Sequence, residues 1–269
     1  MNTTNTNDDA LLIAGTALNS RFLLGSAGYP SPQVLTESIR ASETQVLTVG
    51  LKRTLQAGDN GFVAQALACA QAQGARLLPN TAGCRSAREA VALASMAREL
   101  YATSWIKLEV VGDEHTLQPD PFELLAAAAE LVKLGFTVFP YCTDDLVLCR
   151  RLLDAGCAVL MPWGAPIGSG QGLLHLHALR TLRERLPEAV LIIDAGLGAP
   201  SHAAQALELG FDAVLLNSAV AQAREPVAMA AAFRDAVRAG RRAHLAGLMA
   251  PQDFAVASTP VSGHAFLLG

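Results

Sequence analysis

The chain has 269 residues, of which 51% are hydrophobic and 16% are charged, and its formal net charge at pH 7 is −4. This charge balance excludes a strongly basic surface, so neither nucleic acid nor an anionic membrane is expected as the main partner. No apolar run is long enough to span a membrane, and residues 1–10 lack a signal-peptide pattern, so we predict a cytoplasmic protein with a disordered N-terminal extension over residues 1–10.

Short apolar runs rich in β-branched residues alternate along the chain with longer runs rich in Ala, Leu, Glu and Arg. Several of the apolar runs are continuous rather than alternating, as expected of strands that are covered on both faces. We predict strands over residues 21–25, 46–50, 76–80, 105–110, 136–141, 158–162, 190–196 and 212–218.

The longer runs have the apolar spacing of amphipathic helices. Three of them end with Gly135, Gly156 or Gly210, at the position where a left-handed residue closes a helix. We predict helices over residues 31–42, 84–101, 120–135, 143–156, 201–210 and 226–240.

Eight strands, each followed by a helix or a loop, favour a single-domain α/β fold of the (β/α)8 TIM barrel type over residues 11–245. The competing fold is an open doubly wound sheet, for which a G-x-G-x-x-G turn after an early strand is expected. Neither "GSAG" (25–28) nor "GSGQG" (168–172) meets that expectation. The helical pattern fades after about residue 241, and we assign residues 246–269 to an irregular C-terminal tail.

The predicted strand at residues 105–110 carries a lysine in apolar surroundings. Because strand side chains alternate, Trp105, Lys107 and Glu109 point to one side, and the aliphatic residues between them point to the helix layer. Burial disfavours the charged form of an amine, so we predict a lowered pKa and a partly neutral Lys107 that attacks a carbonyl group to form a Schiff base. A structural ion pair between Lys107 and Glu109 is the alternative, and the pattern alone leaves both open.

Asp194 lies at the carboxyl end of a predicted strand, where barrel enzymes build their active sites. Its carboxylate is predicted to move protons beside Lys107, and the alternative is that it caps the next helix. Small residues follow the last three strands, over residues 164–172, 194–200 and 215–220. Such loops expose backbone N–H groups, and the loops after strands seven and eight are the usual phosphate site of barrels. A phosphorylated ligand is therefore predicted at this rim.

Six segments together resemble bacterial thiazole synthases, in the same order and with similar spacing over roughly residues 11–260. The combination of "WIKLEV", "PIGSGQG" and "DAGLG" is the most specific part of the resemblance. The segments are residues 25–31, 105–113, 117–125, 160–172, 192–210 and 214–230. The resemblance implies a barrel enzyme that makes the thiazole phosphate of thiamine. Its substrates would be 1-deoxy-D-xylulose 5-phosphate, dehydroglycine (glycine imine) and sulfur from the C-terminal thiocarboxylate of a small ubiquitin-like sulfur-carrier protein.

The same resemblance implies roles for individual residues. Lys107 falls on the position of the Schiff-base lysine, and Glu109 and Asp194 fall on those of the acid/base carboxylates. The positions that hold the sugar phosphate correspond to Gly168, Ala195, Gly196, Asn217 and Ser218. The resemblance also implies a homo-oligomer, a dimer or tetramer, and no metal or redox cofactor. Two alternatives stay open: a Schiff-base sugar-phosphate aldolase or lyase, and a non-catalytic sugar-phosphate binding protein.

Overall fold

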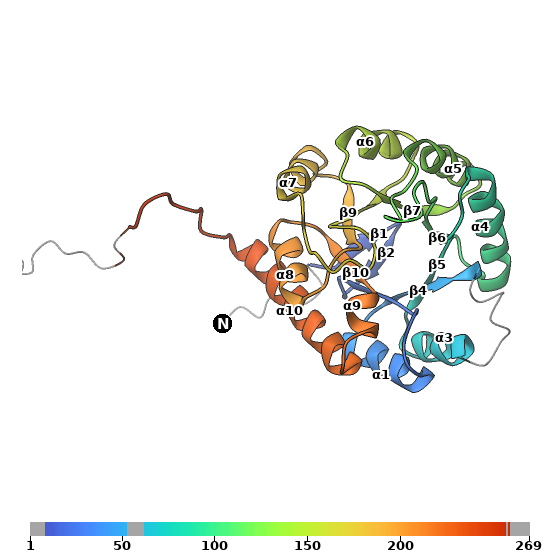
Figure 1. Ribbon diagram of the computed structural model, residues 1–269, viewed down its shortest axis with the longest axis horizontal. Coiled ribbons are helices and arrows are strands. Elements are labelled where there is room, and N and C mark those ends of the chain that lie inside the picture. Colours follow the sequence, from blue (N-terminus) through green and yellow to red (C-terminus); the bar gives the residue numbers. More distant parts are fainter. Residues whose placement is uncertain (1–8, 53–61, 257, 259–269) are drawn as a thin grey trace, which may run out of the picture.

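The computed structural model describes residues 9–52, 62–256 and 258. Among these residues, eight parallel strands close into a barrel with the neighbour order β10-β3-β4-β5-β6-β7-β8-β9, and helices surround it (Figure 1). The strands are β3 (Phe22–Gly25), β4 (Val46–Gly50), β5 (Arg76–Asn80), β6 (Trp105–Leu108), β7 (Thr137–Cys142), β8 (Val159–Pro162), β9 (Val190–Asp194) and β10 (Ala213–Leu216). The predicted single-domain (β/α)8 barrel and all eight predicted strands are confirmed.

Four of the described helices that cover the barrel begin after a residue whose side chain caps the helix. Ser31, Ser86, Asp120 and Asp145 are N-caps whose side chains accept hydrogen bonds from backbone N–H groups of the first turn. The helices are α1 (Pro32–Ser42), α3 (Phe62–Ala72), α4 (Ala87–Tyr101), α5 (Pro121–Lys133), α6 (Leu146–Asp154), α7 (Leu176–Arg185), α8 (Pro200–Glu208), α9 (Ser218–Ala221) and α10 (Pro226–Ala246).

The helix ends also follow the sequence pattern at three places. Gly135, Gly156 and Gly210 have φ angles of 81°, 100° and 89°, which confirms their predicted left-handed conformation. Helix α10 extends past the predicted end at residue 240 and stops at Ala246. Residues 247–256 then form no helix or strand and are exposed, and they leave the barrel as an extended segment (Figure 1).

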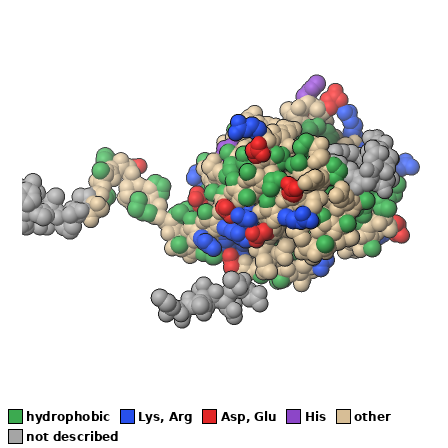
Figure 2. Space-filling model, turned by 90° about the horizontal axis from the view of Figure 1, so that it is seen from below, with side chains coloured by type: hydrophobic (Ala, Val, Ile, Leu, Met, Phe, Trp, Pro, Cys, Tyr) green, Lys and Arg blue, Asp and Glu red, His purple; other side chains and the backbone are tan. Residues whose placement is uncertain are grey.

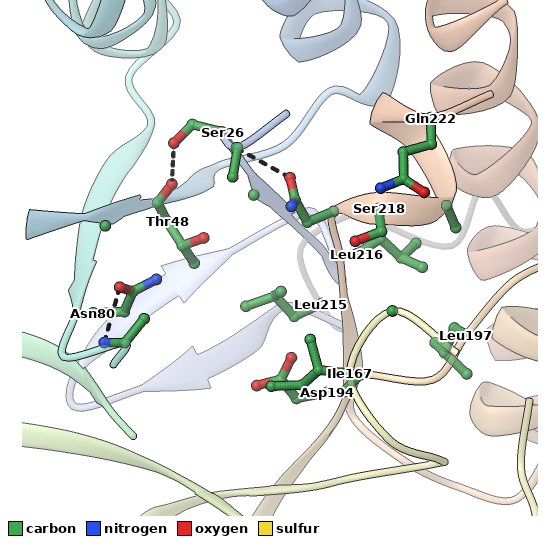
Figure 3. A pocket seen from close by; sticks show the side chains of 18 of the residues that line it. Ser26, Thr48, Asn80, Ile167, Asp194, Leu197, Leu215, Leu216, Ser218 and Gln222 are labelled. Atoms are coloured by element: carbon green, nitrogen blue, oxygen red, sulfur yellow. Dashed lines mark hydrogen bonds between the residues drawn. The ribbon is translucent and has the colours of Figure 1, made fainter. Parts of the chain in front are cut away.

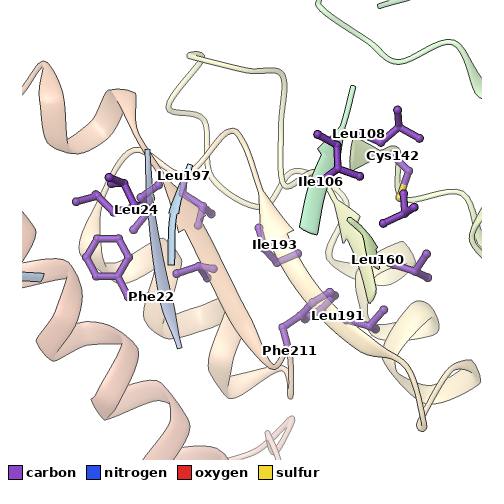
Figure 4. Packing of buried hydrophobic residues seen from close by; sticks show 14 of the residues in the cluster. Phe22, Leu24, Ile106, Leu108, Cys142, Leu160, Leu191, Ile193, Leu197 and Phe211 are labelled. Atoms are coloured by element: carbon purple, nitrogen blue, oxygen red, sulfur yellow. The ribbon is translucent and has the colours of Figure 1, made fainter. Parts of the chain in front are cut away.

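Two layers of apolar side chains stabilise the barrel. Residues such as Ile106, Leu108 and Ile193 point outward and pack between the strands and the helices (Figure 4). Trp105 and Phe139 point inward, with ring centroids 5.0 Å apart, and belong to a separate cluster inside the barrel. The alternation predicted for β6 is therefore confirmed: aliphatic residues face the helices, and Lys107 shares the inner face with Trp105.

A short antiparallel hairpin that the sequence pattern does not predict closes the amino-terminal end of the barrel. Its strands are β1 (Leu11–Ile13) and β2 (Thr16–Leu18). Leu11, Ile13 and Leu18 are buried against the inner side chains at the starts of the barrel strands. The hairpin thus fills the amino-terminal end of the barrel, and the pocket lies at the carboxyl ends of the strands. The predicted disorder of residues 1–10 falls mostly on residues outside the described part of the chain.

Charged side chains on the outer surface of α1 and α10 are mixed in sign. Figure 2 shows basic and acidic side chains lying together on this side of the molecule. Glu43 pairs with Arg234 at 3.2 Å and with Arg238 at 2.6 Å, so these charges compensate one another. In the described part of the chain, no helix is both long and apolar enough to cross a membrane.

Candidate active site

Lys107, Glu109 and Asp194 meet inside the barrel, near the carboxyl ends of β6 and β9. Lys107 Nζ lies 2.7 Å from Asp194 Oδ2 and 3.2 Å from Glu109 Oε1. The side chains of Lys107, Glu109 and Asp194 are 7%, 10% and 4% exposed. The sequence predicted that these residues share a site, and the structure brings them together as one buried, ion-paired cluster.

The protonation state of Lys107 differs from the sequence-based prediction. Burial lowers the pKa of Lys107, but the charges of Asp194 and Glu109 raise it by more, so that its pKa lies above the ordinary value. The prediction of a lowered pKa is therefore wrong, because it considered burial without the second carboxylate. Burial raises the pKa of Asp194, and the charge of Glu109 acts in the same direction, while Lys107 opposes both. The free site holds an ammonium ion beside a carboxylate that accepts protons more readily than an exposed one.

Thr81 fixes the backbone of Glu109 where the regular strand β6 has ended. The Thr81 hydroxyl donates a hydrogen bond to the Glu109 carbonyl and accepts one from the Glu109 N–H, both at 2.8 Å. The Thr81 N–H donates to the Lys107 carbonyl at 3.1 Å. Thr81 is fully buried, so water does not replace these bonds. One side chain directly after the neighbouring strand β5 thus sets the position from which the Glu109 carboxylate reaches Lys107.

Replacing Thr81 by Val is expected to lower the free energy of unfolding by about 2–4 kcal/mol, because two backbone groups of Glu109 lose their partner in a buried site. The measurement is urea unfolding followed by circular dichroism. Thr81→Ser keeps the hydroxyl and is the matched control, with an expected loss of about 1 kcal/mol for the missing methyl group. Equal stability of the Val and Ser variants would contradict the proposed role of the hydroxyl.

A pocket of about 840 Å³ opens at the carboxyl ends of the strands, and all eight predicted site residues line it. Lys107 and Asp194 lie on β6 and β9, and Glu109 directly follows β6. The remaining five follow β8, β9 and β10 in the chain, and they are Gly168, Ala195, Gly196, Asn217 and Ser218, the first residue of α9. Figure 3 shows Asp194 between the side of the pocket formed by Ser218 and Gln222 and the opposite side formed by Asn80. The structure therefore places the buried ionic cluster and the small-residue rim in one cavity.

Two of the rim loops pack backbone against backbone. Gly196 has a φ of 80°, and a Cβ atom added to it would lie 2.3 Å from the Ala165 nitrogen. A Cβ atom on Gly198 would lie 2.3 Å from the Gly170 carbonyl oxygen. The Gly172 N–H donates to the Gly196 carbonyl at 2.8 Å. Only glycine permits this approach, which explains the small residues predicted to form the rim.

Asn217 is held by the end of the first barrel strand and by the residues that follow it. Its Oδ1 atom accepts a hydrogen bond from the Ala27 N–H at 3.1 Å. The side chain fills the space next to Gly25, where a Cβ atom would lie 2.5 Å from the Asn217 Cβ. The Asn217 side chain is therefore fixed at the junction of β10 and β3, where it lines the pocket.

Several polar residues of the pocket were not predicted. Asn80, at the end of β5, is in register with Lys107 on β6, and its Oδ1 accepts a hydrogen bond from the Ala82 N–H at 3.3 Å. Ser26 follows β3, and its hydroxyl donates to the Thr48 carbonyl at 2.8 Å. Gln222 follows the short helix α9. Asn80 and Ser26 lie at the carboxyl ends of barrel strands, and this position is the signal that could have identified them.

Comparisons with known proteins agree with this geometry. A family model described as "Thiazole biosynthesis protein ThiG" matches residues 12–260. The thiazole synthase of Coxiella burnetii (strain RSA 493 / Nine Mile phase I) is 56% identical over 259 residues, covering 95% of this chain and 98% of that protein. The thiazole synthase of Rhodopseudomonas palustris (strain BisB18) is 58% identical over 252 residues, covering 94% and 96% respectively.

A solved structure has the same fold at lower sequence identity. The crystal structure of the Amycolatopsis orientalis BexX/CysO complex contains a chain that superposes with a TM-score of 0.81 at 29% identity, covering 91% of this chain and 98% of that chain. Both the family model and the relatives extend over nearly the whole described barrel, including every residue of the ionic cluster and the rim. The chain therefore belongs to the thiazole synthase family and is an enzyme of thiamine biosynthesis.

Proposed function

We propose that the enzyme forms the thiazole phosphate moiety of thiamine from 1-deoxy-D-xylulose 5-phosphate, dehydroglycine and sulfur carried as a protein thiocarboxylate, through a Schiff base on Lys107. The observation that carries this proposal is the position of Lys107, buried between two carboxylates in a pocket rimmed by backbone loops. A lysine and two acid/base groups are what a sequence of imine formation and proton transfers requires.

The sugar phosphate would bind with its phosphate group against the rim and its C2 ketone at Lys107. Gly168, Ala195, Gly196, Asn217 and Ser218 are proposed to hold the phosphate, because small residues and an amide side chain leave N–H groups accessible to its oxygens. These five residues carry no charge. They can bind the phosphate through hydrogen bonds and still release it with the product.

Lys107 must lose a proton before it attacks the ketone. The nearest acceptor is Asp194, whose oxygen lies 2.7 Å from the lysine nitrogen and whose pKa is raised by burial. After this transfer the neutral amine adds to C2, and the carbinolamine loses water to give the imine. Proton transfer to a neighbouring carboxylate, rather than a lowered pKa of Lys107, thus makes the amine nucleophilic.

The imine makes the neighbouring C3 proton acidic, so that Glu109 or Asp194 can move protons and shift the carbonyl group to C3. The thiocarboxylate of the carrier then adds sulfur at C3. The carrier leaves as its ordinary carboxylate, which takes one oxygen of the sugar, and a further hydroxyl is lost as water. Dehydroglycine then closes the ring: its nitrogen replaces the Lys107 nitrogen at C2, which frees the lysine, and the sulfur bonds to its imine carbon. Glu109 lies 3.2 Å from the Lys107 nitrogen, within reach of the atoms next to the imine carbon.

A protein partner is supported by the related chain in the BexX/CysO complex, which occurs together with a second protein. The pocket opens at the carboxyl ends of the strands, and we propose that the carrier presents its C-terminus there. The homo-oligomer and the cytoplasmic location stay predictions.

The test is reconstitution with a labelled carrier. The full chain is mixed with 1-deoxy-D-xylulose 5-phosphate, with glyoxylate and ammonium as the source of dehydroglycine, and with a sulfur carrier whose terminal thiocarboxylate contains ³⁴S. A thiazole phosphate that is heavier by the isotope, and that is missing when the carrier ends in an ordinary carboxylate, is the expected result. Cleavage of the sugar phosphate without the carrier would instead indicate an aldolase or lyase. Binding without any covalent change would indicate a binding protein.

A further inference from the structure

His202 lies in the first turn of α8 and holds the loop between β9 and α8. Its Nδ1 atom accepts hydrogen bonds from the Gly198 N–H at 3.1 Å and from the Ala199 N–H at 3.3 Å. A ring nitrogen that accepts hydrogen bonds carries no proton, so this arrangement requires a neutral imidazole with its hydrogen on Nε2. The two N–H groups are thereby withdrawn from any ligand, and the loop is fixed in one conformation.

The His202 ring also contacts the second rim loop. A Cβ atom added to Gly172 would lie 3.0 Å from both Cε1 and Nε2 of the ring, so Gly172 packs directly on the imidazole. The Gly172 N–H in turn donates to the Gly196 carbonyl at 2.8 Å. His202 therefore lies where residues 164–172 and residues 195–199 meet. It contacts these loops from behind the residues that line the pocket.

We propose that His202 is a positioning residue for the sugar phosphate: its imidazole holds the two rim loops together in the binding conformation. The inference rests on the proposed function, since it assumes that these loops receive the phosphate. Without the Nδ1 acceptor, the loop between β9 and α8 loses both hydrogen bonds at once, and the affinity for the phosphate falls.

Charged groups around α8 are directed elsewhere. On α8 itself, Glu208 lies at the opposite end, where its carbonyl contacts His244 of α10. Helix α10 meets α8 through Gly240, and its arginines Arg234, Arg238 and Arg241 pair with Glu43 and Asp9. Arg183 of α7 pairs with Asp212, which precedes β10, and β10 itself carries no charged residue.

The charged residues near the rim loops also have partners other than His202. His175 pairs with Asp144, and Asp194 pairs with Lys107. Within the described residues, no ion pair includes His202, so it acts on the loops through the hydrogen bonds of Nδ1 and the packing of its ring.

Two variants separate the imidazole's acceptor role from its bulk. In His202→Asn, the Oδ1 atom is three bonds from Cα, as Nδ1 is in histidine, so it reaches the same N–H groups. His202→Ala removes the acceptor altogether. The measurements, at pH 8, are the KM for 1-deoxy-D-xylulose 5-phosphate and kcat, together with the Kd for the same sugar phosphate by calorimetry. Circular dichroism monitors folding.

For His202→Ala, KM is expected to rise about tenfold with a smaller change in kcat, as for the loss of one to two buried hydrogen bonds. His202→Asn keeps an acceptor for the same N–H groups and is expected to match the wild type.

Unchanged affinity in His202→Ala, or a loss in His202→Asn as large as that in His202→Ala, would overturn the inference about His202 while leaving the proposed function intact. If the wild-type enzyme itself fails to bind the sugar phosphate at pH 8, the proposed function fails, and the role of His202 fails with it.

Discussion

Replacing Lys107 by Arg is expected to abolish covalent capture of the sugar phosphate and to lower turnover by about three orders of magnitude or more, as is usual when a covalent nucleophile is removed. Arginine keeps the positive charge between Asp194 and Glu109, but its guanidinium does not lose a proton in proteins and forms no imine. The measurement is borohydride reduction with 1-deoxy-D-xylulose 5-phosphate, followed by mass spectrometry of peptides. The wild type should give a reduced sugar adduct on Lys107, and the variant should give none.

The choice of arginine follows from the electrostatics of the site. Lys107→Met removes the counter-charge of two buried carboxylates, and breaking a buried ion pair in this way costs about 3–5 kcal/mol. That variant therefore loses stability as well as the nucleophile, and thermal unfolding should show a lower Tm for it than for Lys107→Arg. A sugar adduct in Lys107→Arg, or a wild-type adduct on another lysine such as Lys52, would show that the nucleophile has been misassigned.

Replacing Gly196 by Ala is the second change with a large expected effect. The new Cβ atom would lie 2.3 Å from the Ala165 nitrogen and 2.5 Å from the Ala165 Cβ, and it would adopt a φ of 80° that disfavours residues with a side chain. The two rim loops must then separate, which moves the N–H groups proposed to hold the phosphate. The Kd for the sugar phosphate, measured by calorimetry, is expected to rise by a factor of about one hundred or more, because a misplacement of about 1 Å is enough for such losses.

Gly135→Ala provides the matched control for backbone strain. Gly135 has a φ of 81°, nearly that of Gly196, but no atom lies within 4 Å of the position its Cβ would take. It follows α5, outside the pocket. Gly135→Ala should therefore lose about 1–2 kcal/mol of stability from the left-handed conformation and keep its affinity for the sugar phosphate. If Gly196→Ala binds the sugar phosphate as tightly as Gly135→Ala does, close contact between the loops is not what shapes the site.

The barrel could be predicted from the sequence because the evidence for it is local and repeated. Continuous apolar runs, Ser and Asp caps and closing glycines each act within a few residues, so the chain itself displays them. The hairpin at residues 11–18 lacks such a signal. Each of its strands has three residues. Its burial depends on the hollow left by the inner side chains of strands far along the chain.

The candidate site could be predicted as a set of positions but not as an electrostatic environment. Lys107, Glu109 and Asp194 stand out because charged residues are unusual inside strands, and the rule that barrel sites lie at strand ends brings them together. The pKa of Lys107 was predicted in the wrong direction, since it depends on a distance of 2.7 Å to a residue on another strand. Thr81 and His202 act through backbone groups, and no residue pattern identifies a side chain that holds a neighbouring loop.

The hairpin at the base of the barrel also decides how this enzyme can be attached to other materials. Because Leu11, Ile13 and Leu18 close one end and the pocket opens at the other, the N-terminal side of the hairpin lies on the face away from the pocket. A tether joined ahead of the hairpin to a solid support would orient the pocket towards the solution. Immobilised in this way, the enzyme should admit a partner as large as a protein as freely as it admits a small sugar, whereas a tether at the rim would block the partner first.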